Sequence, residues 1–110
     1  MPATAIRRNI LLTCGGRRIP TIGAFQAAVK GSGRVFACDC DTQAPALHEA
    51  DQGFVVPRMD DPEYSESLLS LCRRHRVGLL VPAMEPELPP LAEHRERFLK
   101  AGLWPLWVGG

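Results

Sequence analysis

Short apolar runs alternate with segments of helical periodicity along nearly the whole of this 110-residue chain. Each run has the length and the nearly continuous apolar character of a strand buried in a parallel sheet. The expected strands cover residues 9–13, 34–39, 53–57, 77–82 and 103–108. The expected helices lie between them, at residues 20–30, within 42–51, at 61–75 and at 86–102. The alternation predicts a three-layer α/β domain, in which a mainly parallel five-stranded sheet carries helices on both faces.

The strand-to-helix loops of such a sheet all lie at the edge formed by the carboxyl ends of the strands. Ligands bind at this edge, at the point where the order of the strands reverses. The residues expected there are 14–19, 39–43, 58–60 and 83–87. The last strand is expected on or near a side of the sheet, because Pro105 cannot donate a hydrogen bond to a neighbouring strand.

The first of these loops contains the sequence TCGGRRIP. Gly15 and Gly16 allow a sharp turn and a close approach of a ligand to the backbone. The following helix attracts anions at its amino end, where Arg17 and Arg18 oppose the helix dipole unless a phosphate or a carboxylate lies nearby. The loop is therefore a candidate anion site, and the alternative is a tight turn with solvated arginines. The dinucleotide fingerprint G-x-G-x-x-G is absent, because the two glycines are adjacent.

Acidic residues follow two other strands at the same edge. Asp39 ends the second strand, where dinucleotide-binding domains place an acid on the ribose, and Asp41 comes shortly after it. Glu85 follows the fourth strand and is a better candidate for ligand contact than Glu87, whose position the dipole of the next helix explains. We select Asp39, Asp41 and Glu85 as candidate binding residues. The alternative for Asp39 is a polar residue that simply ends a strand.

The cysteines and histidines form no recognisable metal or catalytic pattern. Cys38 and Cys40 have the spacing C-x-C, with no second cysteine pair, whereas a structural zinc site usually needs four ligands. Free thiols are the better interpretation of Cys14, Cys38, Cys40 and Cys72. The three histidines lie on three separate expected helices. The sequence therefore names no catalytic residue and no metal ligand.

Charge and hydropathy exclude several classes of partner. The 13 Lys and Arg residues are balanced by 12 Asp and Glu residues, which gives no electrostatic reason to expect nucleic acid or an anionic membrane as a partner. No apolar stretch approaches the ~20 residues of a membrane helix, and the apolar run near the amino end is too short for a signal peptide. We therefore expect a cytoplasmic protein.

The motifs, taken in order, resemble a known family. NILLTCGGRRIPTIGAF, an acidic strand end followed by APALHEAD, VPRMDDPEY, and LLVP followed by PEL are similar to the N-terminal (pre-ATP-grasp) domain of ATP-grasp ligases. The nearest group is the carbamoyl-phosphate-synthase large-subunit-like proteins. The resemblance covers about Asn9 to Val108 and implies a Rossmann-like sheet.

In that family ATP and Mg²⁺ are held mainly by two later domains, which residues 1–110 do not contain. The resemblance implies a single pre-ATP-grasp domain over residues 1–110, with no cofactor of its own. It would be the substrate-side domain of a ligase that joins a carboxylate to an amine, and would not be catalytically complete alone. Its partners would be ATP-grasp domains, in cis or as a separate subunit, and a small-molecule carboxylate. By position, the substrate-cleft loops would contain Gly15, Gly16, Arg17 and Arg18 in the first, Asp39 and Asp41 in the second, and Glu85 in the fourth.

Two other interpretations stay open. One is a free-standing nucleotide- or anion-binding module that uses the GGRR loop. The other is a scaffold that forms a homodimer through an apolar docking face. A docking face could bind either a second copy of the chain or the absent domains. Its candidate residues are Leu103, Trp104, Leu106 and Trp107, although an ordinary edge strand would place them in the core.

Overall fold

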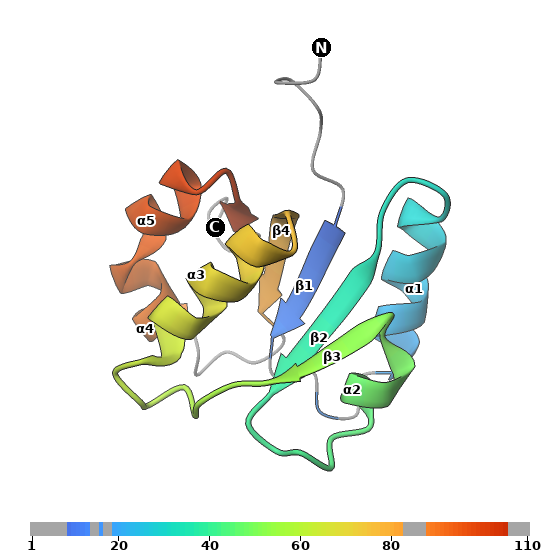
Figure 1. Ribbon diagram of the computed structural model, residues 1–110, viewed down its shortest axis with the longest axis horizontal. Helices are drawn as coiled ribbons and strands as arrows, with labels where there is room; N and C mark the ends of the chain where they lie inside the picture. Colours follow the sequence, from blue (N-terminus) through green and yellow to red (C-terminus); the bar gives the residue numbers. More distant parts are fainter. Residues whose placement is uncertain (1–8, 14–15, 17–18, 83–87, 106–110) are drawn as a thin grey trace.

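The computed structural model describes residues 9–13, 16, 19–82 and 88–105, with residues 88–90 and 104–105 described by their backbone (Figure 1). The elements are, in chain order, β1 (Asn9–Thr13), α1 (Ile19–Val29), β2 (Val35–Asp39), α2 (Ala46–Glu49), β3 (Gln52–Val55), α3 (Tyr64–Arg74), β4 (Val77–Pro82), α4 (Leu88–Glu93), α5 (Arg95–Lys100) and β5 (Trp104–Pro105). The predicted alternation of strands and helices is therefore confirmed. None of the helices in the described part of the chain has the length and apolar character needed to cross a membrane.

The sheet has the strand order β3-β2-β1-β4-β5, and all four pairs of neighbouring strands are parallel. Four strands of four to six residues form its body, and β5 adds two residues at one side. The strand order reverses between β1 and β4, which lie side by side. The parallel sheet and the side position of the last strand were both predicted, although residues 106–108 of that strand lie outside the described residues.

The two faces of the sheet carry two separate cores. On one face, Leu11 and Phe36 pack with Leu68 of α3 and Phe98 of α5. On the other face, the residues of β1 and β2 that alternate with these pack with Ile22 of α1; they are Ile10, Leu12, Val35 and Ala37. Figure 1 shows α1 and α2 on one side of the sheet and α3, α4 and α5 on the other. Because both faces are buried, β1 and β2 read as continuous apolar runs in the sequence.

The last predicted helix, residues 86–102, is wrong as a single element. The chain forms α4 and α5, separated at His94, whose φ and ψ are −112° and 18°. The His94 N–H donates to the carbonyl of Leu91, three residues back, at 3.1 Å, which is tighter than the α-helical spacing. A six-residue helix that contains two prolines has few α-helical hydrogen bonds to resist this change.

Helix α3 begins later than expected. The sequence placed its start at residue 61, but Tyr64 is the first helical residue. Asp61 instead stabilises the turn before the helix: its Oδ1 accepts the Glu63 N–H at 2.8 Å, and its carbonyl accepts the Tyr64 N–H at 3.0 Å. Tyr64, Leu68 and Cys72 of α3 are buried.

Candidate functional site

The carboxyl ends of the strands form the edge at which the sequence placed the binding loops. β1 ends at Thr13 and β4 at Pro82, and these two residues are partners in the sheet register. The carboxyl ends of β1 and β4 therefore lie side by side at the point where the strand order reverses. This is the position at which open α/β sheets bind ligands. The candidates Gly15, Arg17, Arg18 and Glu85 lie outside the described residues.

Gly16 and Asp39, two of the predicted site residues, are in direct contact. The Gly16 N–H donates to Oδ2 of Asp39, with 2.9 Å between the nitrogen and the oxygen. The contact forms because β2 lies next to β1, with Leu12 paired to Ala37, so that both strands end at the same edge. A carboxylate accepts such a bond with more strength than a neutral group. The first and second loops are thus joined by a charge-assisted hydrogen bond.

Gly16 is also held through its carbonyl. The Ala46 N–H, at the start of α2, donates to the Gly16 carbonyl oxygen at 2.9 Å. The φ angle of Gly16 is 50°, in the left-handed region that side chains disfavour, so glycine is the residue suited to this turn. The glycine was predicted from its residue type, whereas Ala46 was not, because any residue except proline can supply a backbone N–H donor.

The second loop is fixed by its own acidic side chains. The Asp41 N–H donates to Oδ1 of Asp39 and the Gln43 N–H donates to Oδ1 of Asp41, both at 2.9 Å. The Asp41 carbonyl accepts the Ala44 N–H at 3.1 Å. These are the local side-chain-to-backbone bonds that aspartates make in turns. Asp39 is therefore in contact with Gly16, whereas Asp41 is exposed and its N–H donates to Asp39.

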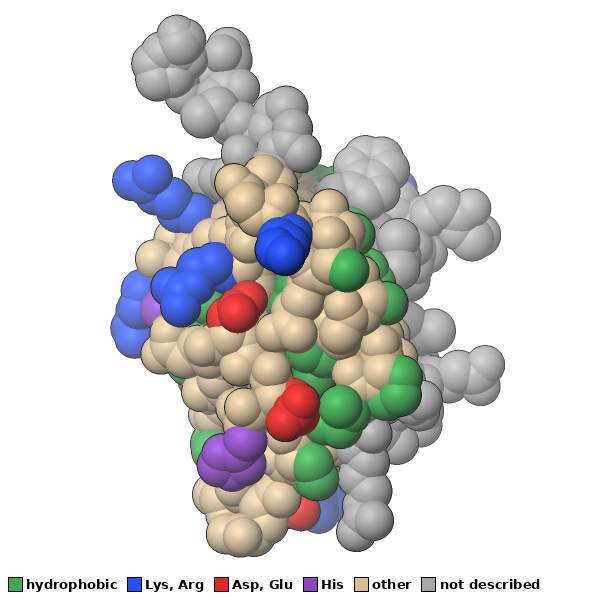
Figure 2. Space-filling view, turned by 90° about the vertical axis from the view of Figure 1, so that its right-hand side faces the viewer, with side chains coloured by type: hydrophobic (Ala, Val, Ile, Leu, Met, Phe, Trp, Pro, Cys, Tyr) green, Lys and Arg blue, Asp and Glu red, His purple; other side chains and the backbone are tan. Residues whose placement is uncertain are grey.

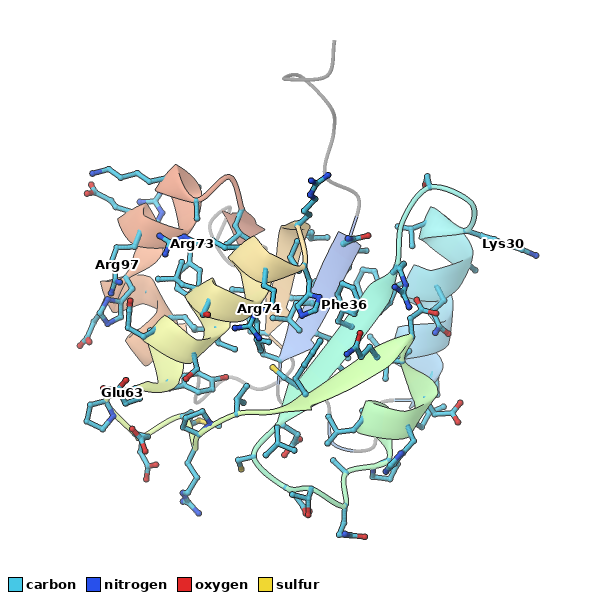
Figure 3. All side chains as sticks on the ribbon, viewed as in Figure 1. Lys30, Phe36, Glu63, Arg73, Arg74 and Arg97 are labelled. Atoms are coloured by element: carbon cyan, nitrogen blue, oxygen red, sulfur yellow. The ribbon has the colours of Figure 1, made fainter. Side chains whose placement is uncertain are left out.

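The charge near the first loop comes from few residues. Helix α1 contains no Asp, Glu, Lys or Arg, and its Ala24, Ala27 and Ala28 are exposed. Figure 2 shows the molecule from the side on which α1 lies. Figure 3 shows Arg73, Arg74 and Arg97 on the α3–α5 side and Lys30 past the end of α1, away from the edge where the strands end.

Arg58 and Arg97 each form an ion pair with an acidic residue. Arg58, in the loop after β3, lies 3.3 Å from Asp60, and both side chains are exposed. Arg97 bonds to Glu66, and this hydrogen bond lowers the pKa of the Glu66 carboxyl. The sequences of the loops at the carboxyl ends of the strands contain Arg17, Arg18 and Arg58 as their basic residues. Because Arg58 is paired with Asp60, Arg17 and Arg18 are the candidates for binding an anion.

A cavity of about 480 Å³ lies at the same edge, between the loop after β3, the start of α3 and the junction of α4 with α5. Its lining is mostly acidic and apolar and consists of Met59, Asp60, Asp61, Pro62, Tyr64, Ser65, Glu93 and His94. The sequence placed residues 58–60 at this edge. It could not bring Glu93 and His94 beside them, because the break between α4 and α5 was not predicted.

The described cysteines are free thiols. Cys38 and Cys72 are buried and Cys40 is exposed, while Cys14 lies outside the described residues. Burial raises the pKa of the Cys72 thiol from 9.0 to about 12, so it is protonated at neutral pH. Among the residues that the structure describes, no three His, Cys, Asp or Glu side chains come together to hold a metal ion.

Residues 10–106 match the family of PylC-like N-terminal domains. The chain belongs to this family. The match covers the sheet, the Gly16–Asp39 contact and all described helices, and it confirms the resemblance to the N-terminal domain of ATP-grasp ligases. None of the curated proteins compared with this PylC-like domain matches it.

Solved structures share the fold of the PylC-like domain. Glycinamide-RNase-transformylase T from Mycobacterium tuberculosis is 21% identical with a TM-score of 0.64, and the match covers 89% of this chain and 28% of that one. A single-chain, multi-domain long-chain acyl-CoA carboxylase is 22% identical with a TM-score of 0.63, covering 86% of this chain and 10% of that one. The dTDP-glucose 4,6-dehydratase of Bacillus anthracis, in complex with NAD, is 16% identical with a TM-score of 0.60, covering 92% and 36%. The PylC-like domain thus spans at most 36% of these chains.

Proposed function

We propose that the PylC-like domain is the substrate-side domain of an ATP-dependent carboxylate–amine ligase similar to the carbamoyl-phosphate-synthase large-subunit-like proteins. Membership of an ATP-grasp ligase N-terminal domain family supports this proposal. The observation that carries it is the hydrogen bond between Gly16 and Asp39, which joins two loops at the edge where the strand order reverses. ATP and Mg²⁺ would be held by ATP-grasp domains, in cis or on a separate subunit.

The chemistry of such a ligase sets the task of these loops. A carboxylate oxygen attacks the γ-phosphorus of ATP, and ADP leaves as the acyl phosphate forms. The amine then attacks the acyl carbon, and inorganic phosphate leaves with the bonding electrons. A substrate carboxylate and an acyl phosphate are both anions, so the cleft needs positive charge and N–H donors. In our proposal Arg17 and Arg18 supply the charge, Gly15 and Gly16 the close approach, and Asp39, Asp41 and Glu85 complete the loops.

The first test is ligase activity in the complete enzyme, meaning the polypeptide that contains this domain or the domain mixed with an ATP-grasp subunit. Hydroxylamine traps an acyl phosphate as a hydroxamate, which identifies the carboxylate substrate from a panel of small acids. We expect Arg17→Ala and Arg18→Ala each to lower kcat/KM for that carboxylate by about tenfold, or 1.4 kcal/mol of transition-state stabilisation. The KM for ATP should be unchanged.

Arg74→Ala is the matched control, because Arg74 is an exposed arginine on α3 rather than in an edge loop. It should retain the wild-type kcat/KM. A wild-type kcat/KM for the carboxylate in both Arg17→Ala and Arg18→Ala would contradict the proposed role of the first loop. ATP hydrolysis at ligase-like rates by residues 1–110 alone would contradict the proposal as a whole.

A second candidate function is a free-standing binding module for a nucleotide or another anion. The observation in its favour is the strand order β3-β2-β1-β4-β5 with Asp39 at the end of β2, the position of the ribose-binding acid in dinucleotide-binding domains. This function predicts saturable binding of ADP or NAD by residues 1–110 alone, weakened in Arg17→Ala and Arg18→Ala. Calorimetric titrations with each nucleotide test it, and the absence of heat from both would count against it.

A further inference from the structure

We infer that Asp39 is a positioning residue that fixes the first loop for an anionic ligand and does not itself contact that ligand. This inference rests on the proposed anion site in the first loop. The two oxygens of the Asp39 carboxylate each accept a backbone N–H, Oδ2 from Gly16 and Oδ1 from Asp41, both at 2.9 Å. The carboxylate is therefore already engaged by the protein on both oxygens.

The orientation of Asp39 is set before any ligand is present. The Asp41 N–H holds Oδ1, and Asp41 is in turn held in its turn by the N–H groups of Gln43 and Ala44. Oδ2 is thereby directed at Gly16, whose carbonyl is bound by the Ala46 N–H from the other side. Gly16 is held at both its donor and its acceptor. A residue of a binding loop that is held in advance loses less entropy when a ligand binds beside it.

The occupied Gly16 N–H also limits where an anion can bind. A phosphate or carboxylate accepts hydrogen bonds, as Asp39 does, so the two would compete for the same donor. The Asp39 charge would in addition repel an anion placed beside Gly16. An anionic ligand that leaves Asp39 in place must therefore use other donors of the first loop, which in our proposal include the guanidinium groups of Arg17 and Arg18. Asp39 then determines which donors of the loop the ligand meets.

The variant that tests this role is Asp39→Asn. Asparagine keeps one acceptor oxygen and presents an NH₂ group in place of the other, so an N–H of Gly16 or of Asp41 faces a donor. Asp51→Asn is the matched control. Asp51 also accepts a backbone N–H of β2 through its carboxylate, from Val35 at 2.7 Å, but at the opposite end of the strand. The two variants make the same change of charge and chemistry at the two ends of β2.

The measurements are made by NMR on the chain of residues 1–110 labelled with ¹⁵N and ¹³C. Hydrogen exchange of the Gly16 amide reports the contact, and titration with inorganic phosphate, followed on the amides of residues 15–18, reports anion binding. We expect Asp39→Asn to accelerate Gly16 exchange by about tenfold. The variant also removes a charge that repels anions, but if the positioning of Gly16 has the larger effect, as we infer, the phosphate Kd rises by about tenfold. Asp51→Asn should change neither. If Asp39 had only a structural role, the two variants would change the phosphate Kd to the same extent.

The outcomes separate the inference from the proposed function. A phosphate affinity in Asp39→Asn that equals or exceeds that of the wild type, with rapid Gly16 exchange, would overturn the positioning role alone. No response of the wild-type chain to millimolar phosphate would overturn the anion site and the positioning role with it. If Asp39→Asn does not fold, the wild type decides: the scalar coupling across the hydrogen bond, from Gly16 nitrogen to Asp39 Cγ, should persist when phosphate is added. Its loss would show that the ligand displaces Asp39 and would overturn the inference.

Discussion

Replacing Gly53 by alanine is expected to lower the free energy of unfolding by about 3 kcal/mol, because the new methyl group has no space. Gly53 lies in β3, where α2 packs against it. A Cβ at this position would lie 2.2 Å from the carbonyl oxygen of Leu47, 2.6 Å from its Cα and 2.7 Å from its carbonyl carbon. These are backbone atoms of α2, which cannot rotate away as the end of a side chain can. Either α2 or β3 must therefore move.

The displacement is expected to reach the candidate site. Helix α2 has four residues, and the first of them is Ala46, whose N–H bonds to the Gly16 carbonyl. A shift of α2 would lengthen this bond and loosen the first loop. Gly53→Ala should therefore weaken any anion binding by the loop, as well as the fold. The stability change is measured by urea unfolding at unchanged m-value, which separates a loss of stability from a change in the unfolded state.

Gly23→Ala provides the control for the loss of a glycine. Gly23 lies inside α1, and a Cβ there would meet no atom within 4 Å. Alanine is the better helix former, so this variant should be more stable than the wild type by about 0.5 to 1 kcal/mol. Wild-type stability of Gly53→Ala would show that α2 does not pack on β3 as closely as the structure describes.

The central strands were predictable because a strand that is buried on both faces consists almost entirely of apolar residues. β1 and β2 are covered on both faces, and their sequences NILLT and VFACD are almost entirely apolar. The edge strand β3 is half exposed, with an alternation that is less clear, and its observed range starts and ends before the predicted one. β3 starts directly after Asp51, whose carboxylate accepts the Val35 N–H at the start of the neighbouring strand β2. Such a contact between residues 16 positions apart is not visible in the local pattern.

The break at His94 was not predictable for a different reason. The apolar residues Leu91 and Phe98 are seven positions apart, which suits one continuous helix, and both are fully buried. What divides the helix is a change of hydrogen-bond partner at His94, from four residues back to three. Side-chain periodicity does not report this change, since both helices can bury the same apolar residues.

In the candidate site, too, the local sequence pattern predicted individual residues but not the contact between them. Residue types identified Gly16 and Asp39 separately, as a turn glycine and as an acid at a strand end. Their contact depends on β2 lying beside β1 in parallel register, which neither motif contains. Leu103 gives a converse example, because it was a candidate for a docking face and is instead part of the core, with 3% of its surface exposed. Its partners in the predicted docking face, Leu106 and Trp107, lie outside the described residues.

Alkaline pH is expected to destabilise the domain through Cys72. Burial raises the pKa of this thiol from 9.0 to about 12, because the thiolate cannot be hydrated in the core between α3 and the sheet. In the unfolded chain the thiol ionises above pH 9, whereas in the folded chain it stays protonated until about pH 12. Above pH 9 the unfolded state therefore binds fewer protons, and stability falls as pH rises.

The size of the effect follows from linkage. Within this window each pH unit removes about 1.4 kcal/mol from the free energy of unfolding, so the fall approaches roughly 4 kcal/mol at its upper end. Below pH 9 the thiol is protonated in both states and contributes no pH dependence. Urea unfolding at pH 7, 9 and 10.5 samples both regimes.

Cys72→Ala isolates the contribution of the thiol from other groups that titrate at alkaline pH. The variant should be less stable than the wild type at pH 7, because it leaves a small cavity, but that cost does not depend on pH. The difference in stability between the two proteins should therefore be constant up to pH 9 and should narrow above it by about 1.4 kcal/mol per unit. A difference that stays constant to pH 10.5 would mean that Cys72 ionises in the folded chain, and so that water reaches the core beneath α3.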